Sequence, residues 1–149
     1  RADCVFMGVR DTEQLGAEIS NMKLLASVPR LYFGCGNLIF RPTRKEADEY
    51  FHYLINEQGD WAAVDHALGI RTRGGASSAQ LPTFTAERML AAAGTYPVVG
   101  GYDDVVDEFR KMSEAGLDGI AIGLVNYIED MPALRGEILP RMERLGLRG

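Results

Sequence analysis

Apolar residues recur at two different spacings along this chain. Short, nearly uncharged apolar runs cover 2–8, 31–40 and 119–123, and they predict buried strands. Between and after these runs, apolar residues recur three and four positions apart, which is the spacing of one helix face. Strand and helix therefore alternate, and this alternation predicts a parallel α/β fold in which right-handed crossovers join neighbouring strands.

Residues that start and stop helices agree with this pattern. Asp11 is a candidate N-cap for a helix over about 12–26, and Thr43 with Glu46 forms a capping-box pattern before a second helix. Gly116 follows a third helical stripe, where a residue that tolerates positive φ commonly ends a helix. The side chains expected to face inward are Leu15, Ile19, Met22, Leu25, Ala47, Tyr50, Phe51, Leu54, Val105, Val106, Phe109 and Met112. Pro140 is expected to kink the last helix.

The interval 57–100 interrupts this alternation. We expect a short helix over Trp61–Leu68, a segment rich in small polar residues over 69–82, and another helix over about 84–93. A connection of this length inside a compact domain is usually a lid, a binding loop or a disordered segment. The pattern leaves these three alternatives open.

Three strand–helix units are too few to close a (β/α)₈ barrel, which needs eight strands and typically about 250 residues. The chain is therefore either a small open α/β sheet or the C-terminal part of a TIM barrel. Its abrupt start in a strand favours the partial barrel. We expect one partial barrel domain over 1–149, with 57–100 as an insertion or lid.

Composition narrows the function classes. The 149 residues are 46% hydrophobic and 25% charged, which is typical of one globular domain. The net charge is −5 and basic residues often stand beside acidic ones, so nucleic acid is not an expected partner. No apolar run approaches the roughly 20 residues that span a bilayer, so we expect a cytoplasmic protein without a membrane segment.

Cysteine and histidine positions do not indicate a redox or metal centre. Cys4 and Cys35 fall inside predicted strands, where a packed, reduced thiol is the usual state. His52 and His66 have no acidic or cysteine neighbours at ligand spacing, and no metal site is expected. Glu129 and Asp130 stand at the start of the last helix, where we interpret them as first-turn acids that stabilise the helix rather than as general acids.

Several segments taken together are similar to one enzyme family. They are Ala2-Asp3, Phe40-Arg-Pro-Thr-Arg-Lys-Glu-Ala47, Tyr96-Pro-Val-Val-Gly100, Gly116-Leu-Asp-Gly119, Tyr127-Ile-Glu-Asp-Met-Pro132 and Glu137-Ile-Leu-Pro140. In this order and at these spacings they resemble the last strands and helices of the bacterial-luciferase-like flavin-dependent monooxygenases, especially the alkanesulfonate and dimethyl sulfone monooxygenase branch.

This resemblance implies an activity and its partners. The family binds reduced FMN at the C-terminal mouth of the barrel and uses O₂ to oxygenate a small organic substrate, organosulfur compounds among them. A flavin reductase would supply the reduced FMN, and a homo-oligomer is expected. Two alternatives stay open: an F420-dependent oxidoreductase with the same barrel, and a non-catalytic partial barrel that assembles with another chain or a second copy.

The resemblance also proposes site residues. Cys35 and Asn37 stand where the alkanesulfonate enzymes carry an arginine and a histidine, which favours a neutral or differently charged substrate here. Arg73 matches an arginine of their lid, and Val125 and Tyr127 lie near the position of a substrate-binding aromatic. We therefore assign Asn37 and Arg73 as candidate catalytic residues and the other three as candidate substrate contacts. The main phosphate-binding loop for FMN is expected upstream of residue 1, so cofactor-binding residues of this chain stay unknown.

Overall fold

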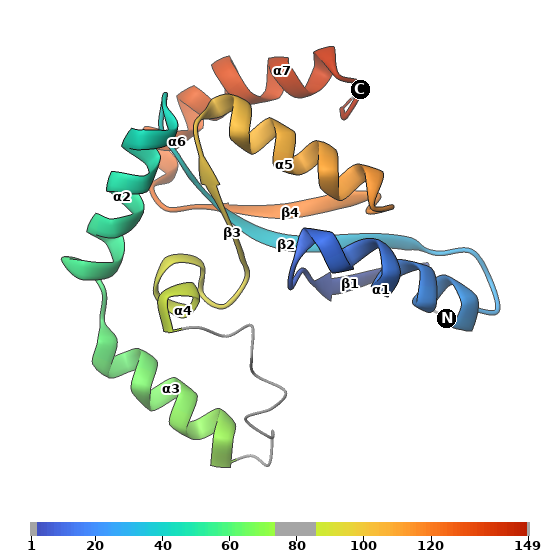
Figure 1. Ribbon diagram of the computed structural model, residues 1–149, viewed down its shortest axis with the longest axis horizontal. Coiled ribbons are helices and arrows are strands. Elements are labelled where there is room, and N and C mark those ends of the chain that lie inside the picture. Colours follow the sequence, from blue (N-terminus) through green and yellow to red (C-terminus); the bar gives the residue numbers. More distant parts are fainter. Residues whose placement is uncertain (1–2, 74–85, 149) are drawn as a thin grey trace.

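Four parallel strands form the sheet of this chain (Figure 1). The computed structural model describes residues 3–73 and 86–148. The strands are β1 (Cys4–Gly8), β2 (Leu31–Phe40), β3 (Tyr96–Gly100) and β4 (Gly119–Leu124). A parallel α/β fold is thus confirmed.

β2 is the centre of the sheet, and its length allows two strands to pair along one flank. β1 pairs with its first half, Leu31–Cys35, and β3 pairs with its second half, Gly36–Phe40. β4 pairs with Phe33–Leu38, which overlaps both registers, so β4 must lie on the opposite flank. The three strands expected from the sequence are therefore neighbours in the order β1, β2, β4, as in an arc of a barrel. β3 lies on the same flank of β2 as β1, beyond the carboxyl end of β1.

β3 is the strand that the sequence analysis did not predict. Its five residues, Tyr96–Gly100, include Pro97 and are followed by Gly101, a composition that indicates a turn before a helix more strongly than a strand. The interval 57–100 thus returns to the sheet instead of ending in a loop, and its last residues become part of the sheet.

Two helices cover one face of the sheet, α1 (Thr12–Leu25) and α5 (Tyr102–Glu114) (Figure 1). The main core lies between them and the sheet and includes Leu15, Ile19, Tyr32, Leu38, Phe40, Val98, Val105, Val106, Phe109 and Met112. The predicted stripe of α5 is confirmed, whereas the stripe of α1 is wrong at its end. Leu25 is 88% exposed there, because it is the last residue of the helix and lies beyond the packed turns.

The helices α2 (Arg44–Asn56), α3 (Trp61–Arg73) and α4 (Ala86–Ala92) form a second group on the other side. A small separate cluster joins this group to the sheet, with Ile39, Ile55 and Ala91 buried at its centre. The predicted capping box of α2 is present: the Thr43 side chain accepts a hydrogen bond from the Glu46 N–H, and the Glu46 carboxylate accepts one from the Thr43 N–H. In Figure 1, α3 extends away from the sheet.

The C-terminal tail is one bent helical run. It comprises α6 (Tyr127–Ala133), a π-helical segment (Leu134–Ile138) and α7 (Leu139–Arg144). Pro140 is the second residue after the π-helical segment, and its missing N–H accounts for the distortion of the preceding turn. Gly116 ends α5 with φ of +101°, as its position in the sequence predicts.

Two further findings bear on function. No helix in the described ranges is long and apolar enough to cross a membrane. Cys4 and Cys35 are both free thiols and both half-buried.

Candidate functional site

The sheet face opposite α1 and α5, which we call the inner face, is covered at Ile39 by the cluster with α2 and α4, and is uncovered along the first part of β2 in the described part of the chain. On β2 the side chains of Leu31, Phe33, Cys35 and Asn37 alternate with residues of the main core and are exposed or half-buried. Phe6 of β1 lies beside Phe33, with ring centres 5.5 Å apart, and is 64% exposed. The inner face is therefore apolar near the start of β2 and becomes polar at Asn37.

Two glycines of β4 make room for the larger side chains of β2 on this face. A Cβ added at Gly119 would lie 2.5 Å from the ring of Phe33, and a Cβ added at Gly123 would lie 2.1 Å from Asn37 Oδ1. Real Cβ atoms do not approach other atoms so closely, so both positions need glycine as long as Phe33 and Asn37 keep these places. Asn37 thus lies across the backbone of Gly123.

The Asn37 amide is free to bind a ligand. It is half-buried, and it makes no hydrogen bond to any residue in the described ranges. A side-chain amide has two N–H donors and one acceptor oxygen, so it can bind both hydrogen-bond acceptors and hydrogen-bond donors of a ligand. Because the amide has no partner in the described part of the chain, this geometry favours a site role for Asn37, which stays a prediction.

The other predicted site residues lie as follows. Cys35 is on the inner face between Phe33 and Asn37, and its register partners are Gly8 and Ala121. Val125 follows β4 directly and is 37% exposed, and Tyr127 opens α6 and is 57% exposed. Both lie at the carboxyl end of β4. Asn37 lies near the carboxyl end of β2, on the same edge of the sheet. Arg73 is the last residue of α3, and its side chain and the rest of its segment lie outside the described residues.

A buried ion pair, which the sequence did not reveal, joins the carboxyl ends of β2 and β4. Arg41 follows β2, and its Nη1 donates to Asp130 Oδ1 at 3.1 Å. Asp130 is 4% exposed, the only buried charged residue in the described part, and its Oδ2 accepts from the Asn126 N–H at 3.0 Å. The Arg41 guanidinium also lies 3.5 Å from the centre of the Tyr50 ring. In the sequence, the one available indication of a special role for Arg41 was its place in an Arg-Pro pair directly after the predicted strand 31–40.

This ion pair lines a cavity of about 250 Å³ at the same edge. Its other lining residues are Phe40, Pro42, Tyr102, Glu129 and Ala133. Since Arg41 is already bound to Asp130 and Glu129 adds a second carboxylate, the cavity offers little attraction to an anion. The predicted helix-start role of Asp130 is confirmed by its bond to the Asn126 N–H, and the ion pair adds a second role to it.

The helices that begin at this sheet edge do not offer a phosphate site. Four helices, α1, α2, α5 and α6, follow a strand directly. At the start of each of these helices a carboxylate already accepts a hydrogen bond from a backbone N–H; these carboxylates belong to Asp11, Glu46, Asp104 and Asp130. Helix N-termini bind phosphate through those N–H groups and through the positive end of the helix dipole. In each of these helices a carboxylate occupies that place.

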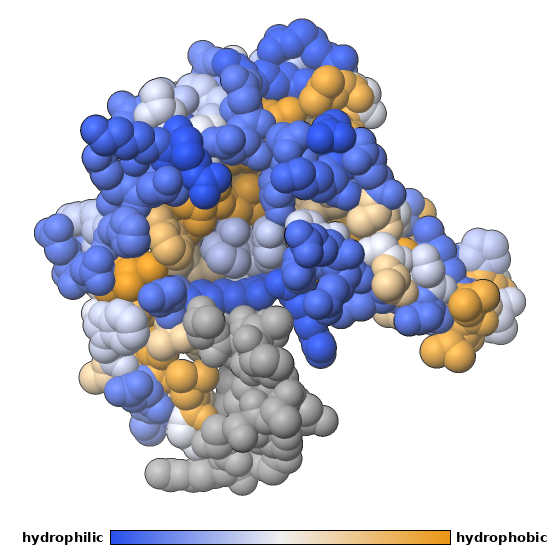
Figure 2. Space-filling model, viewed as in Figure 1, coloured by the Kyte–Doolittle hydropathy of each residue, from blue (hydrophilic) through white to orange (hydrophobic). Residues whose placement is uncertain are grey.

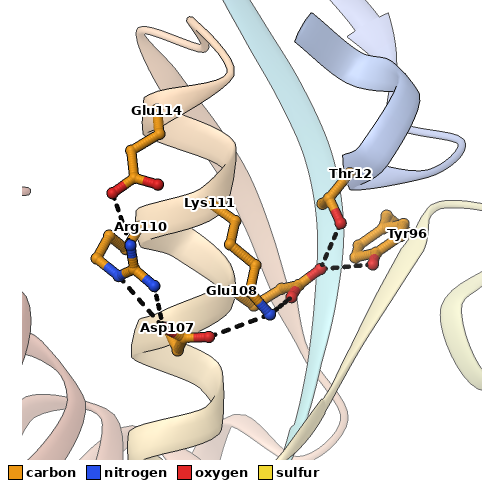
Figure 3. Close-up of polar contacts among 7 residues, drawn as sticks. All are labelled: Thr12, Tyr96, Asp107, Glu108, Arg110, Lys111 and Glu114. Carbon is orange, nitrogen blue, oxygen red and sulfur yellow. Dashed lines mark hydrogen bonds and ion pairs between the residues drawn. The ribbon is translucent and has the colours of Figure 1, made fainter.

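A polar network ties β3 to the helices on the outer face (Figure 3). The Tyr96 hydroxyl donates to Glu108 Oε1 at 2.6 Å, and the Thr12 hydroxyl donates to the same oxygen at 3.2 Å. From α4, the Arg88 guanidinium donates to the carbonyls of Thr95, Arg10 and Val9, so it spans the junction where β1 ends and β3 begins. The interval 57–100 is therefore fixed to the sheet at its return.

This network predicts a dependence of stability on alkaline pH. Burial, and then the hydrogen bond to Glu108, raise the pKa of Tyr96 well above its ordinary value of 10.0. The folded protein then holds a proton that the unfolded chain releases, so the free energy of unfolding should fall as pH rises above about 10. We expect Tyr96→Phe to lose about 1 kcal/mol at pH 7 and to reduce this alkaline fall.

Urea unfolding at pH 7 and at several alkaline pH values would measure both effects. Tyr53→Phe is the matched control, because Tyr53 is 41% exposed on α2. An equal alkaline fall in the wild type and the Tyr96→Phe variant would contradict the assignment to Tyr96.

Comparisons with known proteins place the fold. No protein-family model and no curated protein matches the sequence. Among solved structures, the chain is similar to riboflavin lyase (RcaE), a structure with modified FMN and the substrate riboflavin, at 15% identity and a TM-score of 0.66, over 99% of this chain and 40% of that one. It is also similar to DmoA from Hyphomicrobium sulfonivorans at 18% identity and a TM-score of 0.64, over 98% of this chain and 38% of that one.

A third similar structure is the coenzyme F420 dependent tetrahydromethanopterin reductase from Methanopyrus kandleri. It shares 11% identity at a TM-score of 0.54, over 95% of this chain and 46% of that one. The chain spans less than half the length of each of these three proteins. Its fold matches a part of these structures, which confirms the fold class expected from the sequence, a parallel α/β part of a TIM barrel.

Proposed function

We propose that this chain is the part of a flavin-dependent oxidoreductase that forms one wall of the cofactor and substrate site. The observation that carries the proposal is the Asn37 amide, which has no hydrogen-bond partner among the described residues and lies over Gly123 near the carboxyl ends of β2 and β4. Active sites of parallel barrels lie at that edge. The fold likeness to riboflavin lyase and to the F420-dependent reductase supports a flavin or deazaflavin cofactor.

The residues present fit one half of such a cofactor. An apolar face with two aromatic rings, Phe6 and Phe33, and an amide at its polar end suit a planar ring system with a polar edge. The carboxylates at the helix starts do not suit its phosphate. This agrees with the expectation that the phosphate is held by residues outside this chain.

The roles of this chain's own residues follow from their places. A bound flavin would supply the redox chemistry, and the protein orients it and excludes water. Asn37 would hydrogen-bond the polar edge of the ring or the substrate and fix its orientation. Cys35 adds a small uncharged surface beside it, so we propose a small neutral organic substrate, with organosulfur compounds as one class. Reduced FMN with O₂ is the first choice of cofactor system, and F420 is the alternative.

Asn37→Ala tests the role of the amide. We expect kcat/KM to fall roughly 10- to 100-fold, because the variant loses a hydrogen bond made in a site with little water. The free energy of unfolding should change by less than about 0.5 kcal/mol, since the amide has no partner in the described part of the chain. The protein as its gene encodes it would be assayed with reduced FMN from a flavin reductase, O₂ and candidate substrates.

The other outcomes of this assay are also informative. Turnover with F420 and none with FMN would select the alternative cofactor. An intact, folded protein without turnover on either cofactor would contradict the enzyme proposal. Titration of FMN into the 149-residue chain should show weak or absent binding, and micromolar binding would mean that the phosphate site lies within this chain.

A second candidate function rests on the uncovered inner face. Phe6 and Leu31, 64% and 51% exposed, are apolar residues that proteins usually cover. The chain would then be a non-catalytic module that assembles with another chain, which supplies the missing strands. A monomer by sedimentation, with cooperative unfolding, would contradict this candidate.

A further inference from the structure

A pocket at the amino end of β2, far from the candidate site, is lined by two cationic side chains, Lys23 and Arg30. It has a volume of about 340 Å³ and lies where α1 runs into β2, lined by Lys23, Ala26, Ser27, Val28, Pro29, Arg30 and Tyr32. Asn37 is six positions after Leu31, which is roughly 20 Å along β2. Figure 2 shows apolar surface at this end of the molecule, where Leu24 and Leu25 are exposed.

The cationic groups of this pocket have no acidic partners among the residues that the structure describes. Arg30 Nε is buried and is the one buried side-chain polar atom without a hydrogen-bond partner in the described ranges. Lys23 makes no ion pair there, and its Nζ lies 5.6 Å from the centre of the Tyr32 ring. Asp118 accepts a hydrogen bond from the Tyr32 N–H but does not line the pocket. Two unpaired cations thus share one pocket in a chain of net charge −5.

Uncharged donors surround the same pocket. The backbone N–H groups of Ser27, Val28 and Arg30 have no acceptor among the described residues, and neither has the Ser27 hydroxyl. Arg30 Nε itself is closed to solvent, and so to a ligand in the pocket, but the other N–H groups of the guanidinium also have no acceptor in the described ranges. Donors and cations gathered without an acceptor acid match a group with several negatively charged oxygens.

We propose that this pocket binds a tetrahedral oxyanion, with a small phosphate monoester as the ligand class. Arg30 would provide N–H donors of its guanidinium, and Lys23 would provide a point charge. The pocket volume is at the lower end of small-molecule sites, so a monoester with a small organic group is favoured over a larger ligand. Val28 and Pro29 supply apolar lining for that group.

Titration with inorganic phosphate, methyl phosphate and sulfate tests this, with backbone amide NMR of the 149-residue chain as the readout. Ionic strength is held constant with sodium chloride. We expect saturable shifts confined to residues 23–32 at millimolar concentration, with Arg30→Gln weakening the apparent affinity about 10-fold. Methyl phosphate bound at least as tightly as phosphate would support the monoester, and tighter sulfate binding would replace the phosphate class by a sulfate class.

Lys45→Gln is the matched control, since it removes the same charge from an exposed position on α2. Should Arg30→Gln fail to fold, Lys23→Gln provides the second variant, with the same loss of affinity expected. Shifts that do not saturate, that chloride alone reproduces, or that Lys45→Gln weakens as much as Arg30→Gln would overturn the proposal.

Discussion

Arg41→Ala is expected to lower the free energy of unfolding by about 3 kcal/mol. The substitution removes the partner of Asp130, a carboxylate that is 4% exposed, and leaves it a single hydrogen bond from the Asn126 N–H. Breaking a buried pair costs more than the pair contributes, because a charge then stays buried without compensation. Urea unfolding followed by circular dichroism at pH 7 would measure the change.

Arg44→Ala is the matched control for this experiment. Arg44 pairs with Asp48 on the surface of α2, where both side chains are about half exposed. Such pairs contribute between zero and about 1 kcal/mol. Similar losses in the two variants would show that the Arg41–Asp130 pair has no special weight in joining the strand ends.

The second large effect is expected at Gly123. An alanine there would bring its Cβ to 2.1 Å from Asn37 Oδ1, so the Asn37 side chain or the β4 backbone must move. Overpacking of this kind costs about 1–3 kcal/mol. Because the displaced amide is also the proposed ligand contact, kcat/KM should fall at least as far as in Asn37→Ala.

A double-mutant cycle separates crowding from other effects of the alanine. The three atoms nearest to the added Cβ all belong to the Asn37 side chain. Gly123→Ala should therefore cost much less stability in an Asn37→Ala background, with a coupling of about 1 kcal/mol or more. If the two losses simply add, the contact between Gly123 and Asn37 does not determine the geometry of this face.

The order of elements could be predicted because it depends on local patterns. The limits of β2, the capping box at Thr43 and Glu46, and the positive φ of Gly116 are all set by residues within a few positions of each other. The apolar stripe of α5 is buried as expected, since a 13-residue helix with one apolar face has one way to lie on a sheet.

The features that the sequence did not reveal depend on distant partners. β3 contains Pro97 and forms a strand because β2 extends five residues past the end of β1 and offers it an edge. Arg41 and Asp130 are 89 positions apart, and neither residue alone indicates an ion pair. The place of the Asn37 side chain depends on the glycine at position 123, which the register of β2 with β4 sets beside it.

The position of β3 has a consequence for how this protein can diversify. Residues 57–94 leave the sheet after α2 and come back through a backbone ladder with β2 that Arg88 and Tyr96 reinforce. The return point is thus anchored by main-chain bonds, which tolerate changes of side chain. Length and composition between α2 and β3 can therefore vary while β1, β2 and β4 keep their register.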